Sequence, residues 1–405
     1  MKILLSAYAC EPDKGSEPGV GWNWAVGLSR LGHDVWVVTR ANNRATIDAE
    51  VGRSQRKNLH FVYYDLPAWA KWWKKGQRGV RLYYLFWQIG AWRLARDIHR
   101  NHRLDRVHHV TFVSVRQPSF MGFLGIPFIF GPVAGGERAP WRLRLGYGVR
   151  GMIVDGIRDL LNLWVRFDPL MRLTFRRAER IYITSQQTGR LLPRKYQPKA
   201  RVQLAIGLGN MEMHDKAIHR RAPGSPFRVL YTGNFLYLKG MHLGLAAFSQ
   251  VSGKLPGVRL TMVGQGPEEN RWRRLSKKMG TENKIDWVPW VERRELEDLY
   301  RSHDVLLFPS LHDSGGMVVL EAMAHGLPVV CLDLGGPGVI VTEQCGLIVP
   351  TESSTEKEVV SQLANHLIRL ATDVRLFERL SAGALGRARE FTWDKLIASV
   401  YSEKS

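Results

Sequence analysis

The stretch DVLLFPSLHDSGGMVVLEAMAHGLPVVCLDLGGPGVIVTEQCGLIVP, residues 304–350, decides the fold of this chain. It contains two short apolar runs, Val305 to Phe308 and Leu327 to Leu332, which are typical of strands buried on both faces. Between them, a glycine turn leads into an expected helix from Met317 to His325, which Gly326 would end. The order strand, turn, helix, strand predicts a parallel βαβ unit, and such units bind ligands at the carboxyl ends of their strands.

The turn before this helix has the features of an anion site. The backbone N–H groups of Gly315, Gly316 and Met317 are expected to be free there, and glycine lacks the Cβ that would keep a phosphate at a distance. Two carboxylates flank the turn, Asp313 before the helix and Glu321 within it. Glu321 stands among apolar residues and therefore needs a partner, which is either a group of the fold or the hydroxyls of a sugar or ribose.

This stretch resembles glycosyltransferase family 4, whose members have the GT-B fold. The family signature is an acidic residue, a glycine turn, a second Glu eight positions later and then EAMAxGxPVV, and residues 321–330 are EAMAHGLPVV. The resemblance implies that Asp313 contacts the donor sugar, that Glu321 contacts the ribose, and that the amides between them hold the diphosphate. Asp313 departs from the family, which usually has Glu there, so we expect the shorter side chain to alter the sugar contact.

Two further glycine loops extend the resemblance. Residues 233–240, GNFLYLKG, correspond to a family loop in which Arg and Lys together neutralise the donor diphosphate. Lys239 is retained, whereas Asn234 replaces the Arg, and loss of this cation predicts weaker stabilisation of the leaving diphosphate unless another Arg substitutes. Residues 264–267, GQGP, match the family turn GxGP.

The resemblance thus implies a donor site in the second half of the chain. Its expected members are Gly233, Asn234, Lys239, Gly264, Gly266, Asp313, Gly315, Gly316, Met317, Val318 and Glu321. Catalytic roles are expected for Asp313, Glu321 and Lys239. Since no DxD-type metal site is evident, we predict a metal-independent transferase without a cofactor, in which Lys239 and the helix-end amides take the place of the metal. The resemblance implies that transfer retains the anomeric configuration. The donor sugar would be linked to UDP or GDP.

The first half resembles the family only in its Rossmann-type architecture. Strands are expected at 2–7 and 35–39, with a glycine-bearing loop from Glu11 to Gly21 between the first strand and its helix. In the family this loop lies near the donor phosphate and the acceptor, so Gly19 and Gly21 are candidate functional residues, with a simple tight turn as the alternative. His109, near the end of another expected strand, is a candidate catalytic residue, although a core histidine would fit the same pattern.

The length and composition suit two α/β domains of the GT-B type. The chain has 405 residues and 45% hydrophobic content, enough for two separate cores. We predict a first domain at 1–208, completed by a helix in 389–405 that crosses back to it, and a second domain at 209–388, with a linker at 211–226. Only three cysteines are present, without metal-site spacing, which favours a reducing compartment.

The positive charge is concentrated in the first half. The formal net charge is +21, and residues 51–200 hold 28 Lys and Arg against 8 Asp and Glu. Aromatic and cationic residues alternate in two segments, 63–98 and 141–180, as they do in elements that bind anionic membrane surfaces. The alternative is core helices with a solvated basic face. The uncharged residues 117–136 contain several Pro and Gly, so we expect strand and loop rather than a membrane span there, and no signal peptide is expected.

Together these features predict a cytoplasmic transferase on the inner face of the membrane. Its acceptor would be a lipid-linked or cell-envelope polysaccharide intermediate, such as one of lipopolysaccharide. Three alternatives remain: a nucleotide-sugar epimerase of the same fold, a catalytically weakened GT-B scaffold, and a nucleic-acid binder. The last ranks lowest because the sequence has no recognisable nucleic-acid module.

Overall fold

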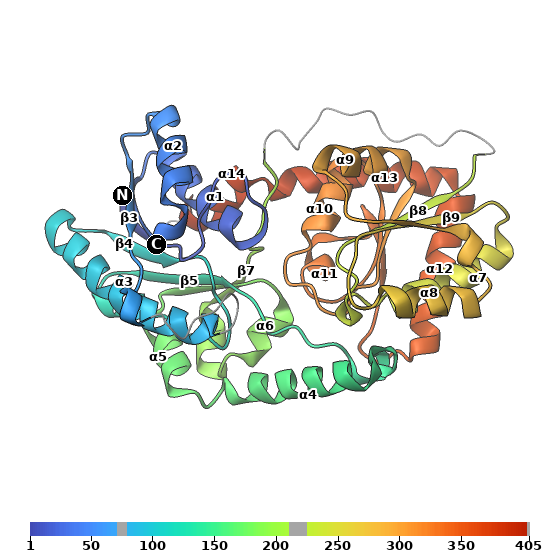
Figure 1. Cartoon of the computed structure of the whole chain (residues 1–405), viewed down its shortest axis with the longest axis horizontal. Helices are drawn as coiled ribbons and strands as arrows, with labels where there is room; N and C mark the ends of the chain where they lie inside the picture. The colour runs from blue at the N-terminus through green and yellow to red at the C-terminus, as the bar shows by residue number, and fades with distance from the viewer. Residues whose placement is uncertain (71–78, 210–224, 403–405) are drawn as a thin grey trace. The chain divides into compact units, whose positions relative to one another are not determined.

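The computed structural model describes residues 1–70, 79–209 and 225–402. The chain divides into two compact units (Figure 1). The first comprises Met1–Gly136, Leu160–Ile206 and Trp393–Ser405, and the second comprises Glu137–Asp159 and Gly207–Thr392. The division differs from the predicted domains mainly because residues 137–159 group with the second unit; residues 207–208 and 389–392 also belong to it. The division therefore falls inside helix α4, Gly148–Trp164.

The first unit is built on a parallel seven-stranded sheet with the order β3-β2-β1-β4-β5-β6-β7. The strands are β1 Lys2–Ser6, β2 Asp34–Thr39, β3 Leu59–Tyr63, β4 Arg106–His109, β5 Phe128–Val133, β6 Arg180–Ile183 and β7 Ala200–Val202. The helices are α1 Ser16–Arg30, α2 Arg44–Ser54, α3 Val80–His102, α5 Pro169–Arg177, α6 Gln186–Leu191 and α14 Trp393–Ser402.

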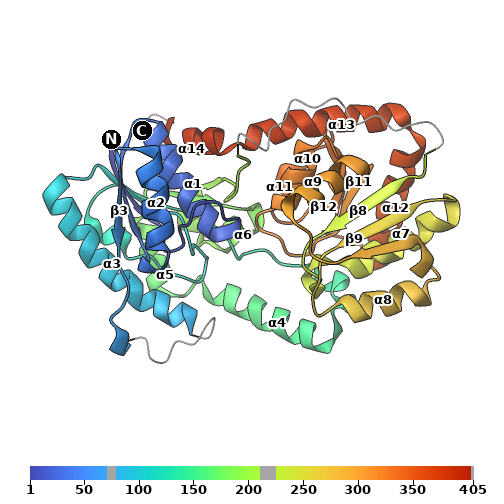
Figure 2. The ribbon, with the colours of Figure 1, turned by 45° about the horizontal axis from the view of Figure 1, so that its top comes forward.

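Helices cover both faces of this sheet, which explains the continuous apolar runs in its strands. On one face, Tyr84 and Trp87 of α3 and Phe175 of α5 form a buried cluster with residues of β1, β4 and β5. The other face is covered by α1, against which α14 packs (Figures 1 and 2). That contact is close, since a Cβ at Gly27 would lie 2.2 Å from Cδ1 of Ile397. The last helix therefore belongs to the first unit, as the predicted crossing back requires.

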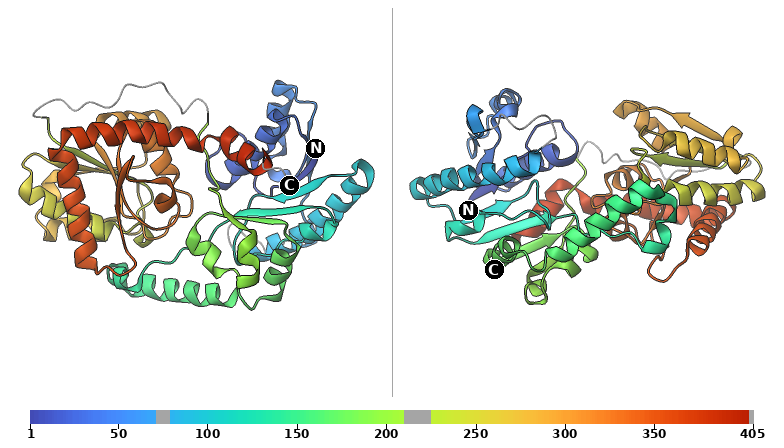
Figure 3. Two further views of the ribbon diagram at one scale, coloured as in Figure 1. Left: turned by 180° about the vertical axis from the view of Figure 1, so that it is seen from behind. Right: turned by 60° about the horizontal axis from the view of Figure 1, so that its bottom comes forward.

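The second unit contains a parallel six-stranded sheet with the order β10-β9-β8-β11-β12-β13. The strands are β8 Arg228–Thr232, β9 Arg259–Val263, β10 Ile285–Val288, β11 Val305–Phe308, β12 Val329–Leu332 and β13 Gly346–Val349. The helices are α7 Met241–Lys254, α8 Glu269–Lys278, α9 Arg293–Ser302, α10 Met317–Ala324, α11 Pro337–Ile340, α12 Glu356–Thr372 and α13 Val374–Ala388. Helix α12 packs on α7, and α13 packs on α10 (Figure 3).

Strand order in the second sheet identifies the place for a ligand. The chain moves outward from β8 to β9 and β10, and then returns to β11 on the other side of β8. Such a reversal leaves a crevice outside the carboxyl ends of the central strands. The predicted βαβ unit of residues 305–332 is confirmed as β11, α10 and β12, with Gly326 in the left-handed conformation at φ +74°.

The prediction of a loop from Glu11 to Gly21 is wrong in its extent, because helix α1 of the first unit begins at Ser16. Residues 117–136 form a short 3-10 helix at Met121–Leu124 and strand β5, and within the described ranges no helix has the length and hydropathy of a membrane span. Of the predicted aromatic and cationic segment at 63–98, residues 71–78, including Trp72 and Trp73, lie outside the described residues.

Candidate functional site

Three loops of the second unit pack together at the carboxyl ends of β8, β9 and β11. Phe235 N–H donates to Gln265 O over 2.9 Å, and Leu311 N–H donates to Leu238 O over 2.9 Å. The approach is so close that Gly264, at φ +137°, could not have a side chain, since its Cβ would lie 2.1 Å from the carbonyl oxygen of Gly233. The two glycine motifs predicted for the donor site therefore form one structural element with the loop after β11.

Lys239 and Asp313 form the charged centre of these loops. Lys239 Nζ lies 2.6 Å from Asp313 Oδ2, and both side chains are largely buried. Asp313 Oδ1 accepts hydrogen bonds from the N–H groups of Gly315 at 3.0 Å and Gly316 at 2.8 Å. The prediction that these two amides are free is therefore wrong for this structure, because the side chain just before them accepts their hydrogen bonds.

A second glycine pair holds the backbone of Asp313. Gly336 N–H donates to Asp313 O over 2.7 Å. Gly335 has φ +59°, and a Cβ there would lie 2.1 Å from the same oxygen. This pair was not predicted, although the run Gly335-Gly336-Pro337-Gly338, which begins three residues after the end of β12, indicates a second loop at the same sheet edge.

Glu321 has a partner inside the fold. Its Oε2 accepts a hydrogen bond of 3.1 Å from the hydroxyl of Tyr300 on α9. Burial and, to a lesser degree, the charge of Glu321 raise the pKa of Tyr300 well above its ordinary value, so the hydroxyl remains a donor. Both side chains line a pocket whose other members are Arg293, Leu296, Glu297, Ala324 and His325. This contact supports the alternative of a structurally paired Glu321, and its ribose contact stays a prediction.

Asn234 is exposed, at the position where the resembled family has a cation. Its carbonyl oxygen accepts a hydrogen bond of 3.2 Å from Tyr231. Cations do lie near this loop: burial raises the pKa of Tyr237, and Arg158, Arg144 and Arg150 oppose that rise electrostatically. These arginines come from the segment 137–159, which the sequence analysis had assigned to the first domain.

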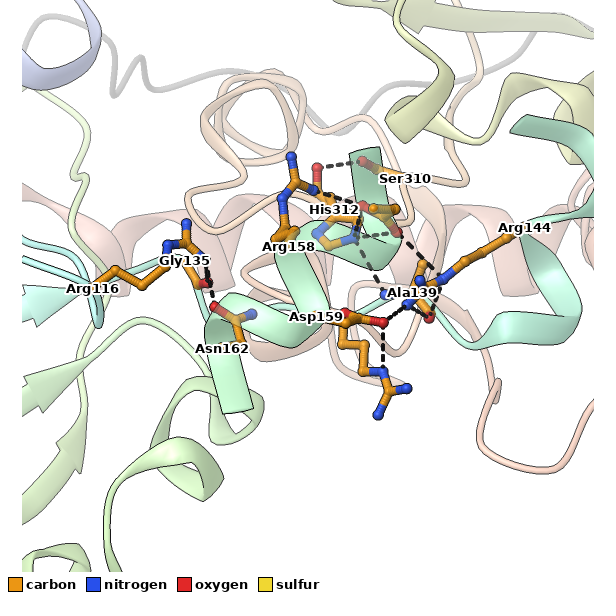
Figure 4. Close-up of polar contacts among 11 residues, drawn as sticks. Arg116, Gly135, Ala139, Arg144, Arg158, Asp159, Asn162, Ser310 and His312 are labelled. Atoms are coloured by element: carbon orange, nitrogen blue, oxygen red, sulfur yellow. Dashed lines mark hydrogen bonds and ion pairs between the residues drawn. The ribbon is translucent and has the colours of Figure 1, made fainter. Parts of the chain in front are cut away.

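The residue before Asp313 connects the candidate site to α4. His312, labelled in Figure 4, has its Nε2 atom 3.3 Å from the carboxylate of Asp155, which is 0% exposed. Arg144 Nε at 3.3 Å and Arg158 Nη1 at 2.9 Å also contact this carboxylate. Burial raises the pKa of Asp155, but the hydrogen bond and charge of His312 and the two guanidinium groups outweigh it and lower that pKa below its ordinary value. Sequence reasoning missed this network, since its members are far apart in the chain.

Gly19 and Gly21 lie in the first turns of α1 rather than in the predicted loop. Both are buried against preceding backbone. A Cβ at Gly19 would lie 2.0 Å from Lys14 O, and a Cβ at Gly21 would lie 2.2 Å from Ala9 O. These contacts give both glycines a packing role, and a contact with substrate remains a prediction.

His108 and His109 point to opposite faces of the first sheet, as neighbours on a strand do. His108 contacts Tyr401 of α14 at 3.0 Å, whereas His109 contacts the hydroxyls of Tyr84 at 2.5 Å and Ser119 at 2.7 Å. Burial lowers the pKa of His109 to about 4, despite an opposing hydrogen bond to Thr111 O. With 1% exposure and both ring nitrogens bonded, His109 has the surroundings of a core histidine, and its catalytic role remains untested.

Comparison with known proteins identifies the relatives of this chain. Residues 215–382 match the family described as glycosyl transferases group 1. A D-inositol 3-phosphate glycosyltransferase of Streptomyces bingchenggensis is 29% identical over 56% of this chain and 53% of its own length. The chain thus spans about half the length of this curated relative.

Solved structures resemble the whole chain at low sequence identity. The lipopolysaccharide outer core galactosyltransferase WaaB superposes with a TM-score of 0.64 at 12% identity, covering 100% of both chains. Anabaena HepE in complex with UDP-glucose gives a TM-score of 0.57 at 15% identity, again over 100% of both. These similarities establish the GT-B fold, with two Rossmann-like units.

Proposed function

We propose that the chain transfers a sugar from a nucleoside diphosphate donor to an acceptor, because residues 215–382 match the family described as glycosyl transferases group 1. The donor is linked to UDP or GDP and binds at the Lys239 and Asp313 loops of the second unit. Transfer retains the anomeric configuration, and Lys239 with the amides at the start of α10 stabilises the leaving diphosphate.

The main support for this proposal is that the carboxylate of Asp313 already accepts hydrogen bonds from the groups that would bind the phosphates. Asp313 accepts hydrogen bonds from Lys239, Gly315 and Gly316, which together are one cation and two amides at a helix N-terminus. A diphosphate offers the same kind of oxygen with more charge, so it would compete with Asp313 for these donors. Asp313, once displaced, would be free to accept hydrogen bonds from the sugar.

The proposed acceptor is a lipid-linked or cell-envelope oligosaccharide at an anionic membrane surface. Support comes from the excess of 28 Lys and Arg over 8 Asp and Glu in residues 51–200. The structural neighbour WaaB acts in the lipopolysaccharide outer core, as its name states. We accordingly place the protein at the cytoplasmic face of the membrane as a peripheral protein.

Thermal denaturation with a panel of nucleotides tests the donor. UDP, GDP, ADP and the corresponding nucleotide sugars would each be added to the full chain. A nucleotide present at 100 times its dissociation constant stabilises the folded state by about 2.7 kcal/mol. We expect UDP or GDP to raise the melting temperature and ADP not to do so. No shift with any nucleotide would instead favour the catalytically weakened scaffold.

A nucleotide-sugar epimerase of the same fold is the second candidate. It would use the same donor loops but need no acceptor. Incubation of the protein with the stabilising nucleotide sugar alone, followed by analysis of the sugar, separates the two. Formation of an epimer without acceptor would replace the transferase proposal.

A further inference from the structure

Helix α4, Gly148–Trp164, is inverted in polarity relative to a helix on the surface of a globular domain. Its inward residues are polar and bonded. Asp159 pairs with Arg144, and Asn162 accepts a hydrogen bond from Arg116 (Figure 4). Asp155 also pairs with Arg144. The helix is therefore fixed to the protein by ion pairs and hydrogen bonds.

The outward residues of α4 are apolar. Val149, Ile153, Ile157, Leu160 and Trp164 follow one another at spacings of four and three, which places them along one side of the helix. They are strongly exposed, for example Val149 at 77%, Leu160 at 68% and Trp164 at 65%. Further exposed apolar residues flank this row or follow the helix: Met152, Val154, Leu161, Leu163, Phe167 and Leu170. A continuous apolar surface of this kind marks an interaction site.

Charge around this surface indicates what covers it. Between residues 141 and 178, every exposed charged residue is an arginine: Arg142, Arg150, Arg166, Arg172, Arg176 and Arg177. The acidic residues of the same stretch, Asp155, Asp159 and Asp168, are buried or half-buried, and the exposed Glu179 that follows is paired with Arg106. An exposed apolar row within a stretch whose exposed charged residues are all arginines matches the layered chemistry of an anionic bilayer, with acyl chains inside and phosphates outside.

A second copy of the chain fits this surface less well. In a two-fold dimer the same surface faces itself, so the arginines that border one row would face those of the other. Like charges brought together in this way repel.

We propose that the outward row of α4 inserts into an anionic membrane surface, with Trp164 at the interface and the bordering arginines on lipid phosphates. This inference rests on the membrane-side acceptor of the proposed function and identifies the element that binds the membrane. It places Ile153, Ile157 and Leu160 at the level of the acyl chains. It also places Asp155, on the inner side of the same helix, next to His312 and the Asp313 loop.

Vesicle binding by the full chain tests the proposal. We expect wild type to float with vesicles of phosphatidylcholine and phosphatidylglycerol and not with phosphatidylcholine alone. Ile157→Glu with Leu160→Glu should weaken binding about tenfold or more, since it removes two apolar groups from the bilayer and adds anionic charge. Val374→Glu with Trp290→Glu is the matched control, because it changes two exposed apolar residues elsewhere and should bind as wild type does.

The cationic border needs its own pair of variants. Arg150→Gln with Arg166→Gln should weaken binding at low salt, and the difference from wild type should shrink as salt screens the remaining charges. Arg375→Gln with Arg379→Gln on α13 removes two exposed arginines away from α4 and serves as the control. Equal losses in both pairs would show that only total charge matters, which would overturn the role of α4.

A fluorescent probe reports insertion directly. All three native cysteines are buried, so a thiol placed at Ile157→Cys can be labelled selectively with an environment-sensitive dye. Its emission should shift to the blue with anionic vesicles, whereas the same dye at Val374→Cys should not respond. An unshifted probe on vesicle-bound protein would overturn the proposal. The proposal would also be overturned if wild type were a dimer, Ile157→Glu with Leu160→Glu were a monomer, and neither protein bound vesicles.

Nucleotide-induced stabilisation, measured on the same proteins, keeps this inference separate from the donor site. Loss of vesicle binding with intact stabilisation by UDP or GDP supports α4 as the membrane element and shows that the variant is folded. Vesicle binding through α4 without any nucleotide effect would defeat the donor proposal alone.

Discussion

Lys239 Nζ and Asp313 Oδ2 lie 2.6 Å apart, although 74 positions separate the two residues in the chain. The pair joins the loop after β8 to the loop after β11 at the point where the strand order reverses. In this structure Asp313 neutralises the cation and accepts hydrogen bonds from two amides at the start of α10. Donor binding would therefore begin with an exchange of partners, from the carboxylate to the diphosphate.

Asp313→Asn should separate nucleotide binding from sugar transfer. Removing the charge frees Lys239 and lowers the repulsion that an incoming diphosphate meets, so UDP or GDP should bind at least as tightly as to wild type. Transfer should fall about tenfold or more, because the sugar loses an ionised acceptor that makes stronger hydrogen bonds than an amide. Isothermal titration and a transfer assay measure the two effects. Equal loss of binding and transfer would indicate a collapsed loop.

Lys239→Ala should reduce turnover with little change in the melting temperature. The ammonium group would stabilise charge on the leaving diphosphate, and loss of one such group costs about 10²-fold or more in turnover. Lys254→Ala, which changes an exposed lysine at the end of α7, provides the control. Turnover of Lys239→Ala equal to that of this control would exclude Lys239 from the donor site.

Glu321→Gln tests the ribose contact against the structural one. The amide keeps the shape of the side chain and can still accept from Tyr300, so stability should change by about 1 kcal/mol or less, as for a neutral hydrogen bond. If Glu321 binds the ribose, KM for the nucleotide sugar should rise severalfold. Tyr300→Phe, which removes the hydrogen bond from the other side, provides the comparison. If Glu321→Gln and Tyr300→Phe lose similar stability and neither changes KM, Glu321 has a structural role only.

Much of the second unit was predictable because its signals are local. Short apolar runs ended by Pro or Gly marked β11 and β12, and the glycine turn marked the start of α10. Gly19 and Gly21 were misplaced because glycine usually indicates a turn. Here its missing Cβ instead lets α1 approach the carbonyl oxygens of Lys14 and Ala9.

The interactions within the site were less predictable because they join distant parts of the chain. The sequence around Asp313 does not predict that its side chain pairs with Lys239, and Asp155 lies 157 positions from His312. The apolar residues of α4 were visible, and their helical spacing was recognised. Which side of α4 faces outward depends on the buried partners of its acidic residues, and only the structure provides these.

His109→Gln should affect stability and its pH dependence rather than turnover. The folded pKa of about 4 lies below the ordinary 6.5, so the unfolded chain binds the proton first as pH falls. The stability contribution of neutral His109 is therefore complete above pH 6.5 and is lost as pH falls toward 4, by up to about 1.4 kcal/mol per pH unit. Glutamine does not titrate, so the variant should show a shallower decline.

Urea denaturation of wild type and His109→Gln at pH 7.5, 6 and 5 measures this slope. His108, whose pKa burial lowers to about 3, has the same sign and leaves a residual slope in both proteins. Turnover at pH 7.5 distinguishes the catalytic alternative, since loss of a general acid or base costs about 10²-fold to 10⁴-fold. A loss of that size with unchanged stability would restore His109 as a catalytic residue.

Asp155→Asn should weaken both the fold and the donor loop. Asp155 is fully buried among Arg144, Arg158 and His312, so removal of its charge leaves cations without their partner and should cost about 3–5 kcal/mol of unfolding free energy. The pKa of Asp155 is lowered, so its contribution is present above the ordinary value of 3.8 and is lost as pH falls through the folded pKa. The difference in unfolding free energy between wild type and variant, measured by urea denaturation, should therefore persist at pH 7 and 5 and disappear in strong acid.

Asp298→Asn is the control for this variant, because it removes an exposed partner of Arg301 and should change stability by about 1 kcal/mol or less. Because His312 precedes Asp313, Asp155→Asn should also weaken UDP or GDP binding severalfold, and unchanged affinity would show that the donor loop is held independently of α4.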